Sequence, residues 1–318
     1  MRISVLGCGR WGSFLAWYLC RTGHEVTLYG RAASWRMERL LKCRENDLLQ
    51  IPEGVQLTTD LAAAVSRAEA LVISVGVQSL RSFLRELAGL DLSGRALVLC
   101  MKGLEAETGL RITEIVAQEL GPIPCAIWVG PGHVQDFLRG VPNCMVIDSA
   151  DAALREALVR AFSSDLIRFY YGDDLIGNEI GAAAKNVVGI AAGMLDGYDL
   201  TSLKGALMAR GTREVGRLIG ALGGSERSAY GLAHLGDYEA TVFSPYSHNR
   251  AFGERFVRGE RYAQLAEGMA TAKALRVLST RCGVGLPICG AVYDVLYEGV
   301  NPREALSNLF LRSLKREF

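Results

Sequence analysis

The chain has 318 residues, half of them hydrophobic, and its 35 basic and 34 acidic side chains give a formal net charge of +1 at pH 7. This length suggests two domains. Because the charges are so evenly balanced, the chain is not one of the strongly basic proteins that bind nucleic acid or anionic membrane surfaces. The eight cysteines are scattered without a C-x-x-C pair, which favours reduced thiols over a metal site or a disulfide framework. No leader precedes the first strand and no apolar run approaches the roughly 20 residues of a membrane span. We therefore expect a cytoplasmic protein without stable membrane association.

Up to about residue 171, short β-branched segments alternate with longer amphipathic ones, which is the pattern of a parallel sheet wrapped by helices. The expected strands are Ile3–Leu6, Glu25–Tyr29, Ala70–Val75, Ala96–Met101, Cys125–Val129, Cys144–Asp148 and Ile167–Tyr170, with helices such as Trp11–Arg21, Val77–Ala88, Gly109–Leu120 and Ala152–Phe162 between them. Beyond Gly172 we expect only helices, at Asp174–Leu195, Ser202–Leu222, Tyr246–Arg258, Met269–Cys282, Ile288–Glu298 and Pro302–Leu311. The prediction is an α/β fold: a Rossmann-type doubly wound sheet over residues 1–171, then an all-α substrate and catalytic domain over residues 172–318.

A glycine-rich segment follows the first strand, where Gly7-Cys8-Gly9-Arg10-Trp11-Gly12 matches G-x-G-x-x-G. A helix pattern follows it and a second strand comes next, which is the context in which this motif binds dinucleotides. The first glycine permits a tight turn, the second lets the backbone approach a pyrophosphate, and the third lets the helix pack against the sheet. Because the helix N-terminus offers N–H groups to phosphates, we predict an NAD(P) site here.

The end of the second strand bears on which dinucleotide binds. NAD-selective sites place Asp or Glu there, where it accepts a hydrogen bond from the ribose 2′-hydroxyl. Here the strand ends in Gly30-Arg31, with Arg36 nearby, and an arginine can bind a 2′-phosphate through two hydrogen bonds. We therefore rank NADP(H) ahead of NAD(H). The alternative is that Arg31 only stacks on the adenine, which would leave a weak preference.

Three later segments carry groups suited to hydride transfer, which needs a proton donor for the forming alkoxide and cations that hold an anionic substrate. The first contains Lys102, directly after a hydrophobic strand. Open α/β sheets bind ligands at the carboxyl ends of their strands, so Lys102 is a candidate ligand. The alternative is a solvent-facing lysine in a turn.

The second segment surrounds Lys185, whose neighbours from Gly181 to Val188 are mostly small or apolar. A lysine in such surroundings loses solvation, which favours its neutral form and suits it to proton transfer near neutral pH. The alternative is a lysine whose stem lies along a packed helix while its ammonium reaches solvent.

The third segment runs from Asp237 past Thr241 to Ser247-His248-Asn249-Arg250. It combines a carboxylate, hydroxyls, an amide and potential cations, which is a mixture suited to a phosphate or a polyol. The alternative is a capped helix start, in which Asp237 and Ser247 accept hydrogen bonds from backbone N–H groups.

In this order the segments resemble the bacterial NAD(P)-dependent glycerol-3-phosphate dehydrogenases over essentially the whole chain. The most specific stretch is Gly181-Ala182-Ala183-Ala184-Lys185-Asn186-Val187-Val188-Gly189-Ile190-Ala191-Ala192-Gly193-Met194-Leu195-Asp196-Gly197, which looks like the catalytic-lysine helix of that family. Lys102-Gly103-Leu104-Glu105, Gly236-Asp237, Asn249-Arg250 with Phe252-Gly253, Glu267-Gly268 and Leu286-Pro287-Ile288 also match.

The resemblance implies that Lys185 exchanges a proton with the oxygen on C2 as glycerone phosphate and sn-glycerol 3-phosphate interconvert, a reaction that feeds glycerophospholipid synthesis. Asp237 close to Lys185 would orient the ammonium and offset its burial. Substrate binding would fall to Lys102, the Gly130 backbone, Lys185, Asp237, Ser247, His248, Asn249 and Arg250. Cofactor binding would fall to Gly7, Gly9, Arg10, Trp11, Gly12, Arg31, Lys102, Val134 and Glu267. The family also implies a homodimer.

Two segments depart from the family pattern. The family usually carries Ser-Gly-Pro-Ser/Thr-Phe-Ala where this chain has Val129-Gly130-Pro131-Gly132-His133-Val134, so both hydroxyl side chains are lost. His248 stands where the family has an arginine that grips phosphate, and a neutral imidazole is the poorer phosphate ligand. Either Arg250 or His133 compensates, which we favour because the lysines are intact, or the substrate differs.

Two other functions compete with this hypothesis. One is a related two-domain dehydrogenase that acts on a carboxylate substrate, such as a ketopantoate reductase or a hydroxy-acid dehydrogenase. The other is a regulatory protein that binds NAD(P) without turning anything over. The presence of Lys102, Lys185 and Asp237 together argues against the regulatory protein.

Overall fold

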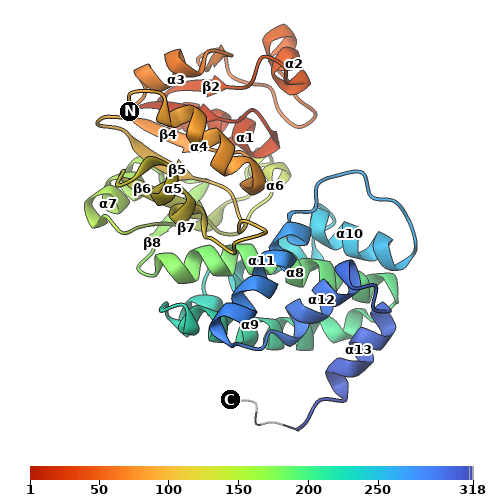
Figure 1. The fold of residues 1–318 in the computed structure, drawn as a ribbon. Coiled ribbons are helices and arrows are strands. Elements are labelled where there is room, and N and C mark those ends of the chain that lie inside the picture. The colour runs from red at the N-terminus through yellow and green to blue at the C-terminus, as the bar shows by residue number, and fades with distance from the viewer. Residues whose placement is uncertain (315, 317–318) are drawn as a thin grey trace. The chain divides into compact units, whose positions relative to one another are not determined.

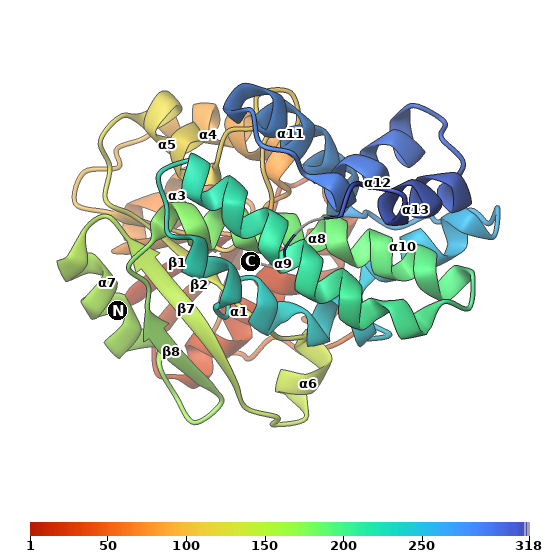
Figure 2. The same ribbon diagram turned by 90° about the horizontal axis from the view of Figure 1, so that it is seen from below.

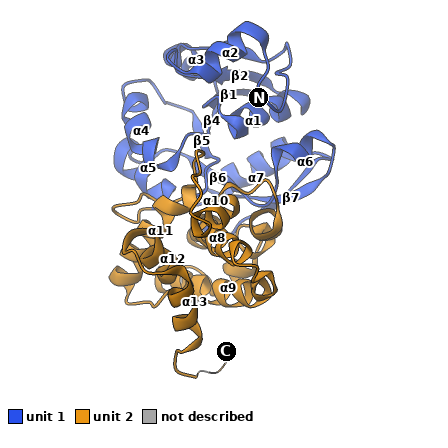
Figure 3. Cartoon of the chain, turned by 90° about the vertical axis from the view of Figure 1, so that its right-hand side faces the viewer, with its two compact units in different colours: residues 1–102, 111–175 blue, residues 103–110, 176–318 orange. Residues whose placement is uncertain are grey.

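The computed structural model describes residues 1–314 and 316, and it divides the chain into two compact units (Figure 3). Unit 1 comprises Met1–Lys102 and Arg111–Leu175, and unit 2 comprises Gly103–Leu110 and Ile176–Phe318. The sequence suggested one boundary near residue 171, whereas the division falls after Leu175 and also groups a short loop from the first half with unit 2.

Unit 1 is built on one eight-stranded sheet with the order β3-β2-β1-β4-β5-β6-β7-β8 (Figure 1). The strands are β1 Arg2–Leu6, β2 Glu25–Tyr29, β3 Gln56–Thr58, β4 Ala70–Ile73, β5 Ala96–Leu99, β6 Cys125–Val129, β7 Asn143–Ser149 and β8 Ile167–Tyr171. The helices between them are α1 Arg10–Arg21, α2 Trp35–Cys43, α3 Leu61–Arg67, α4 Leu80–Ala88, α5 Ile112–Leu120, α6 Val134–Leu138 and α7 Ala152–Phe162, with a 3₁₀ turn at Val77–Ser79. The predicted Rossmann-type doubly wound sheet is confirmed.

Both faces of this sheet are covered, as the alternation along β1 shows. Ile3 and Val5 are buried in a core that includes Phe14 of α1. Ser4, between them, faces the other way and donates a hydrogen bond to the carbonyl of Ala64 in α3 at 2.7 Å. The strand order reverses between β1 and β4, and open α/β sheets bind ligands at the carboxyl ends of strands beside such a reversal.

One strand departs from the all-parallel pattern that the sequence predicts. β7 pairs antiparallel with β6, with Val129 opposite Val146. β8 is again parallel to β7 and lies at the edge of the sheet (Figure 2). The connection between β6 and β7 contains only the five-residue helix α6. Parallel neighbours usually require a full crossover helix, so this shorter connection returns the chain in the opposite direction.

The described residues of unit 2 form helices and loops without a strand, as predicted. Its helices are α8 Leu175–Gly197, α9 Lys204–Ala221, α10 His248–Val257, α11 Glu267–Cys282, α12 Pro287–Tyr297 and α13 Pro302–Phe310. Between α9 and α10 the chain forms 3₁₀ turns at Glu226–Tyr230 and Leu235–Asp237 and a single π-helical turn at Glu239–Phe243.

Helix α8 is the central element of unit 2. It is buried from Gly177 to Ile190 without interruption, and Ile180, Ala184 and Val187 belong to a core shared with α9, α11 and α12. A mostly apolar helix of this kind is expected to be buried on all sides. Nowhere in the described part of the chain does a helix combine the length and the apolar character that crossing a bilayer demands.

Candidate active site

The glycine loop of unit 1 meets the demands of its motif at each position. Gly7 has φ +124°, and a Cβ there would lie 2.2 Å from the carbonyl oxygen of Ser74, just after β4. A Cβ on Gly12 would lie 1.9 Å from the carbonyl oxygen of Gly7, so α1 packs directly on the loop. A Cβ on Gly9 would meet nothing within 4 Å, and α1 begins at the next residue. The backbone at Gly9 is therefore open at a helix N-terminus, which suits a pyrophosphate.

Two further cofactor candidates also belong to the packed interior of unit 1. The ring of Trp11 lies 5.0 Å from that of Phe14 and 6.5 Å from that of Phe137, between ring centroids. Val134, at the start of α6, is 4% exposed and lies in the same core. Arg10, in contrast, is exposed as the first residue of α1. Contacts of these residues with a cofactor remain predictions.

Arg31 lies just beyond β2 and forms an ion pair with Glu86, with 2.7 Å between Nη2 and Oε1. Both side chains are about half exposed, at 55% and 45%. An exposed pair of this kind contributes about 0–1 kcal/mol, so its exchange for a phosphate would cost little. The guanidinium of Arg36, on α2, lies 4.7 Å from the ring centre of Trp35, and both side chains are exposed.

Lys102 lies in the loop after β5, and its side chain forms a hydrogen bond with the residue that follows β6. Its Nζ donates to the carbonyl oxygen of Gly130 at 2.5 Å. Gly130 has φ +132°, and a Cβ there would lie 2.9 Å from Cα of Met145 in β7. The Gly130 backbone is therefore fixed by the antiparallel return of the chain, and the lysine ammonium is anchored beside it.

The missing hydroxyl at Gly132 has a structural reason. Gly132 has φ +146°, and a Cβ there would lie 2.3 Å from the Phe137 ring. A serine or threonine would be strained at this φ and would also displace the ring. The loop is thus built around glycine, and the hydroxyl of the family pattern does not fit its present conformation.

In unit 2 the predicted pairing of Lys185 with Asp237 is confirmed. Nζ of Lys185 lies 2.8 Å from Oδ2 of Asp237 and donates to Oγ1 of Thr241, also at 2.8 Å. The two charged side chains are only 9% and 1% exposed. A buried ion pair requires such hydrogen bonds to offset the loss of solvation, and removing either partner would leave an uncompensated charge.

Glycines on α8 explain how the helix brings Lys185 to this carboxylate. Gly181, Lys185, Gly189, Gly193 and Gly197 follow one another at four-residue intervals, so they share one row of the helix surface. A Cβ on Gly193 would lie 1.9 Å from the carbonyl oxygen of Arg250 in α10. One on Gly189 would lie 2.7 Å from Cγ2 of Thr241. The segment from His234 to Val257 can therefore lie directly on α8, with Lys185 beneath it.

The buried imidazole of His234 supports the same turn. Its Nδ1 lies 2.8 Å from the carbonyl oxygen of Gly181, and its Nε2 lies 2.8 Å from the hydroxyl of Tyr238. Burial, together with the nearby charge of Lys185, lowers the pKa of His234 to about 4. The ring is therefore neutral at physiological pH and adds no charge beside Lys185 and Asp237.

The polar run at the start of α10 proves to be both a helix cap and a junction. Oγ of Ser247 accepts a hydrogen bond from the backbone N–H of Arg250, as the capping interpretation expected. Asn249 donates to Oδ1 of Asn186 at 3.0 Å and accepts from the N–H of Gly268 at 2.9 Å. It thereby ties the residue after Lys185 to the start of α11, where Glu267 lies.

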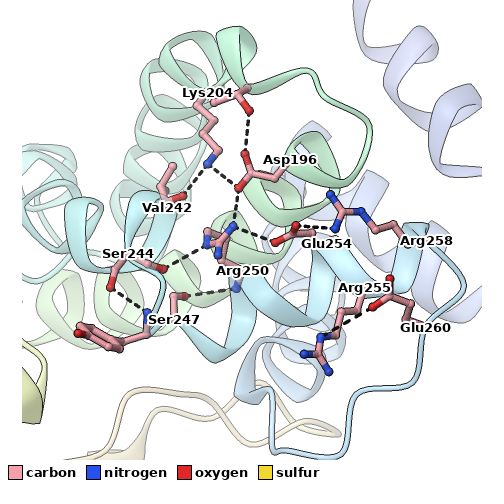
Figure 4. Close-up of polar contacts among 12 residues, drawn as sticks. Asp196, Lys204, Val242, Ser244, Ser247, Arg250, Glu254, Arg255, Arg258 and Glu260 are labelled. Carbon is pink, nitrogen blue, oxygen red and sulfur yellow. Dashed lines mark hydrogen bonds and ion pairs between the residues drawn. The ribbon is translucent and has the colours of Figure 1, made fainter.

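The two nitrogen-bearing side chains of this run, His248 and Arg250, have different surroundings. Nδ1 of His248 lies 2.6 Å from the hydroxyl of Tyr262, which fixes the orientation of the imidazole. Arg250 is 17% exposed and contacts Asp196 at 2.8 Å and Glu254 at 3.1 Å (Figure 4). Because its charge is already matched by two carboxylates, Arg250 could take over a phosphate only at the expense of these bonds. This arrangement does not favour it as the group that compensates for His248.

Several polar groups of unit 2 were missed by sequence reasoning or given no role. Thr241 was noted but not counted as a site residue, and His234, Tyr262 and Asp196 were not singled out. A histidine three residues before Asp237 was a usable signal, whereas nothing local marks Tyr262 as a partner of His248. Within residues 1–314 and 316, no three His, Cys, Asp or Glu side chains gather in a way that could hold a metal ion.

A Rossmann-type unit with an open glycine loop and a helical unit with a buried lysine on a carboxylate define the class of nicotinamide-dependent dehydrogenases. Comparison with known proteins narrows this class. The family models for the N-terminal and C-terminal parts of NAD-dependent glycerol-3-phosphate dehydrogenase match residues 2–155 and 174–307. The chain belongs to this family.

Individual relatives match over their full lengths. A protein of Bradyrhizobium sp. strain ORS 278, named glycerol-3-phosphate dehydrogenase (NAD(P)+), is 40% identical over 99% of this chain and 98% of its own. A protein of the same name from Pelodictyon phaeoclathratiforme is 36% identical over 100% of this chain and 99% of its own. The crystal structure of glycerol-3-phosphate dehydrogenase from Coxiella burnetii has a TM-score of 0.91 at 28% identity, covering 98% of this chain and 99% of that one.

Proposed function

We propose that this chain catalyses the NAD(P)H-dependent interconversion of glycerone phosphate and sn-glycerol 3-phosphate, which feeds glycerophospholipid synthesis. The observation that carries the proposal is the buried ammonium of Lys185, held at 2.8 Å by the Asp237 carboxylate and at 2.8 Å by the Thr241 hydroxyl. Membership of the family and full-length relatives of that name support the choice of reaction.

The bound nicotinamide cofactor supplies or accepts the hydride. In the reducing direction, we assign to Lys185 the transfer of a proton to the oxygen on C2 as that oxygen becomes an alkoxide. An ammonium has three N–H donors, and directing two of them at Asp237 and Thr241 fixes the direction of the third. In the oxidising direction the same lysine, once neutral, takes the proton back. Asp237 stabilises the charged form in a site with little water.

We also propose which residues bind the cofactor and which bind the substrate. Gly7, Gly9 and Gly12, with Arg10 and Trp11 at the start of α1, would hold the dinucleotide, because the loop leaves open space at Gly9. The further cofactor candidates are Arg31, Lys102, Val134 and Glu267. The substrate candidates are Lys102, the Gly130 backbone, Lys185, Asp237, Ser247, His248 and Asn249; Arg250 is the least favoured candidate, because Asp196 and Glu254 already match its charge. We also propose the two domains as residues 1–171 for the dinucleotide and 172–318 for substrate and catalysis.

Arg31 is proposed to give the site its tolerance for a 2′-phosphate. Replacing Arg31 with alanine is expected to raise KM for NADPH about tenfold or more and to leave KM for NADH nearly unchanged, because one charge-assisted hydrogen bond contributes about 1.5–3 kcal/mol. The matched control is Arg2→Ala, which removes the arginine of another exposed pair, Arg2–Glu69. Equal changes in the two KM values of Arg31→Ala would assign Arg31 to adenine stacking instead.

His248 is proposed to weaken the grip on phosphate. The variant His248→Arg is expected to lower KM for glycerone phosphate, because a guanidinium can bind phosphate through two hydrogen bonds. Steady-state kinetics at pH 7.5, where an ordinary imidazole is mostly neutral, should show a fall of about tenfold while KM for NADPH stays constant. An unchanged KM for glycerone phosphate would mean that position 248 does not contact this substrate.

Competition separates the proposed reaction from the carboxylate alternative. Inorganic phosphate and a phosphorylated triose should inhibit competitively, whereas a simple hydroxy acid should not. Inhibition by the hydroxy acid alone would instead favour a dehydrogenase of the ketopantoate or hydroxy-acid type.

The remaining assignments concern the setting of the reaction. We propose a cytoplasmic enzyme that acts as a homodimer on a small phosphorylated substrate, without a nucleic-acid partner or a stable membrane association. The balanced charge of the chain, +1 at pH 7, supports the exclusion of nucleic acid. Sedimentation of the purified protein would test the dimer.

A further inference from the structure

Three charged side chains, Asp196, Lys204 and Arg250, form a cluster in contact with the turn that carries Thr241. Oδ2 of Asp196, at the end of α8, lies 2.6 Å from Nζ of Lys204 and 2.8 Å from Nη1 of Arg250 (Figure 4). Asp196 and Lys185 are eleven positions apart on α8, so the cluster lies roughly 16 Å along the helix from the proposed proton donor. We propose that Asp196, Lys204 and Arg250 are positioning residues, which hold Thr241 and through it the ammonium of Lys185.

Both cations reach the turn through a second hydrogen bond. Nζ of Lys204 donates to the carbonyl oxygen of Val242 at 2.9 Å, and Nε of Arg250 donates to that of Ser244 at 3.1 Å. Val242 directly follows Thr241, whose hydroxyl accepts from Lys185 at 2.8 Å. Asp196 is therefore connected to the ammonium of Lys185 through the Lys204 ammonium, the Val242 carbonyl, and the backbone and hydroxyl of the neighbouring Thr241.

The backbone of the turn explains why it needs these side chains. Glu239–Phe243 forms a single π-helical turn, a rare geometry that is frequent at functional sites. Val242 is fully buried and Ser244 is 6% exposed, so their carbonyl groups require partners other than bulk water. Lys204 and Arg250 supply those partners, and they hold the turn in a conformation that an ordinary α-helix would not provide.

The charges in the cluster depend on one another. Lys204 is 5% exposed, and bringing two buried cations together would be unfavourable without the carboxylate between them. Burial tends to raise the pKa of Asp196, but the hydrogen bonds from Lys204 and Arg250 outweigh it and leave that pKa below its ordinary value. Asp196 therefore stays charged near neutral pH and keeps both cations directed at the turn.

The inference rests on the proposed role of Lys185, and it is tested by Lys204→Met, which keeps the length of the side chain and removes its charge. A shift of about 1 Å in a catalytic group can cost as much as 10²-fold in rate. We expect kcat for glycerone phosphate reduction to fall about tenfold or more, with KM for that substrate within about threefold of wild type. The dissociation constant of NADPH, measured by fluorescence, should not change. Lys204→Arg, which can still donate to both partners, should restore most of the lost kcat.

The matched control is Arg258→Ala. Arg258 belongs to the same cluster through Glu254, at 2.9 Å, but its contact leads away from the turn (Figure 4). The Arg258→Ala enzyme should keep wild-type kcat. This result would show that loss of an ion pair on α10 does not by itself lower kcat as Lys204→Met does. If Lys204→Met does not fold, as judged by circular dichroism, Asp196→Asn carries the same expectations.

The outcomes separate this inference from the proposed function. A folded Lys204→Met or Asp196→Asn enzyme with wild-type kcat would overturn the positioning role, even if its melting temperature falls. A Lys204→Arg enzyme no more active than Lys204→Met would overturn it as well. An inactive wild-type protein would instead contradict the proposed function itself, before any variant is compared.

Discussion

Replacing Lys185 with alanine is expected to lower kcat for glycerone phosphate reduction by about 10²-fold or more, because the variant lacks the proposed proton donor. NADPH should still bind with nearly unchanged affinity, since the glycine loop lies in unit 1 and is untouched by the change. Steady-state kinetics together with fluorescence titration of NADPH measure both quantities.

The control for this variant is Lys273→Ala, which removes a lysine of unit 2 that is 42% exposed and lies over the Tyr297 ring. It should retain wild-type kcat. Loss of the Lys185 ammonium also leaves Asp237 buried without its cation, so thermal stability should be recorded alongside activity. A folded Lys185→Ala enzyme with near-normal turnover would contradict the assignment of the proton donor.

Replacing Gly193 with alanine is expected to disrupt the contact between α8 and α10. The added methyl group would lie 1.9 Å from the carbonyl oxygen of Arg250 and 2.8 Å from the backbone nitrogen of Glu254. Neither backbone group can move aside without displacing the helix, so the cost should exceed the usual penalty for overpacking, about 1–3 kcal/mol. We expect a melting temperature lower by several degrees and a marked loss of activity, because α10 and the Thr241 turn are displaced together.

Gly205→Ala provides the comparison within a helix. Gly205 lies near the start of α9, is exposed, and has nothing within 4 Å of its would-be Cβ. Alanine there should be neutral or stabilise the protein by about 0.5–1 kcal/mol, because it reduces the freedom of the unfolded chain. Equal melting temperatures for the Gly193→Ala and Gly205→Ala proteins would show that α8 and α10 are not packed as closely as described.

The elements that could be predicted from the sequence are those whose residue pattern follows from their own backbone geometry or burial. The glycine loop, the strands of the sheet and the long apolar helix around Lys185 each carry a pattern that follows from local geometry or burial. The Lys185–Asp237 contact was foreseen through the family resemblance and is present at 2.8 Å. The shorter elements α2, β3, α3 and α6 were left unassigned, although Asp60 caps α3 and gave a usable signal.

Other features could not be read from the sequence because they depend on contacts between distant segments. The direction of β7 is set by the short return after Gly130, and the strand pattern does not encode it. The pairing of His248 with Tyr262 and the carbonyl contacts of Lys204 each join residues that no local pattern relates. The glycines at 189, 193 and 197 are visible in the sequence as small residues, but no local pattern shows that they pack against Thr241 and α10.

The central claim is that this chain reduces glycerone phosphate with a nicotinamide cofactor. The most direct test measures NADPH and NADH oxidation at 340 nm by the purified protein, side by side, with glycerone phosphate as substrate. Substrate-dependent oxidation, with NADPH accepted at least as well as NADH, is the predicted result. Binding of either dinucleotide without oxidation, or oxidation with a 2-keto acid but not with glycerone phosphate, would contradict the account.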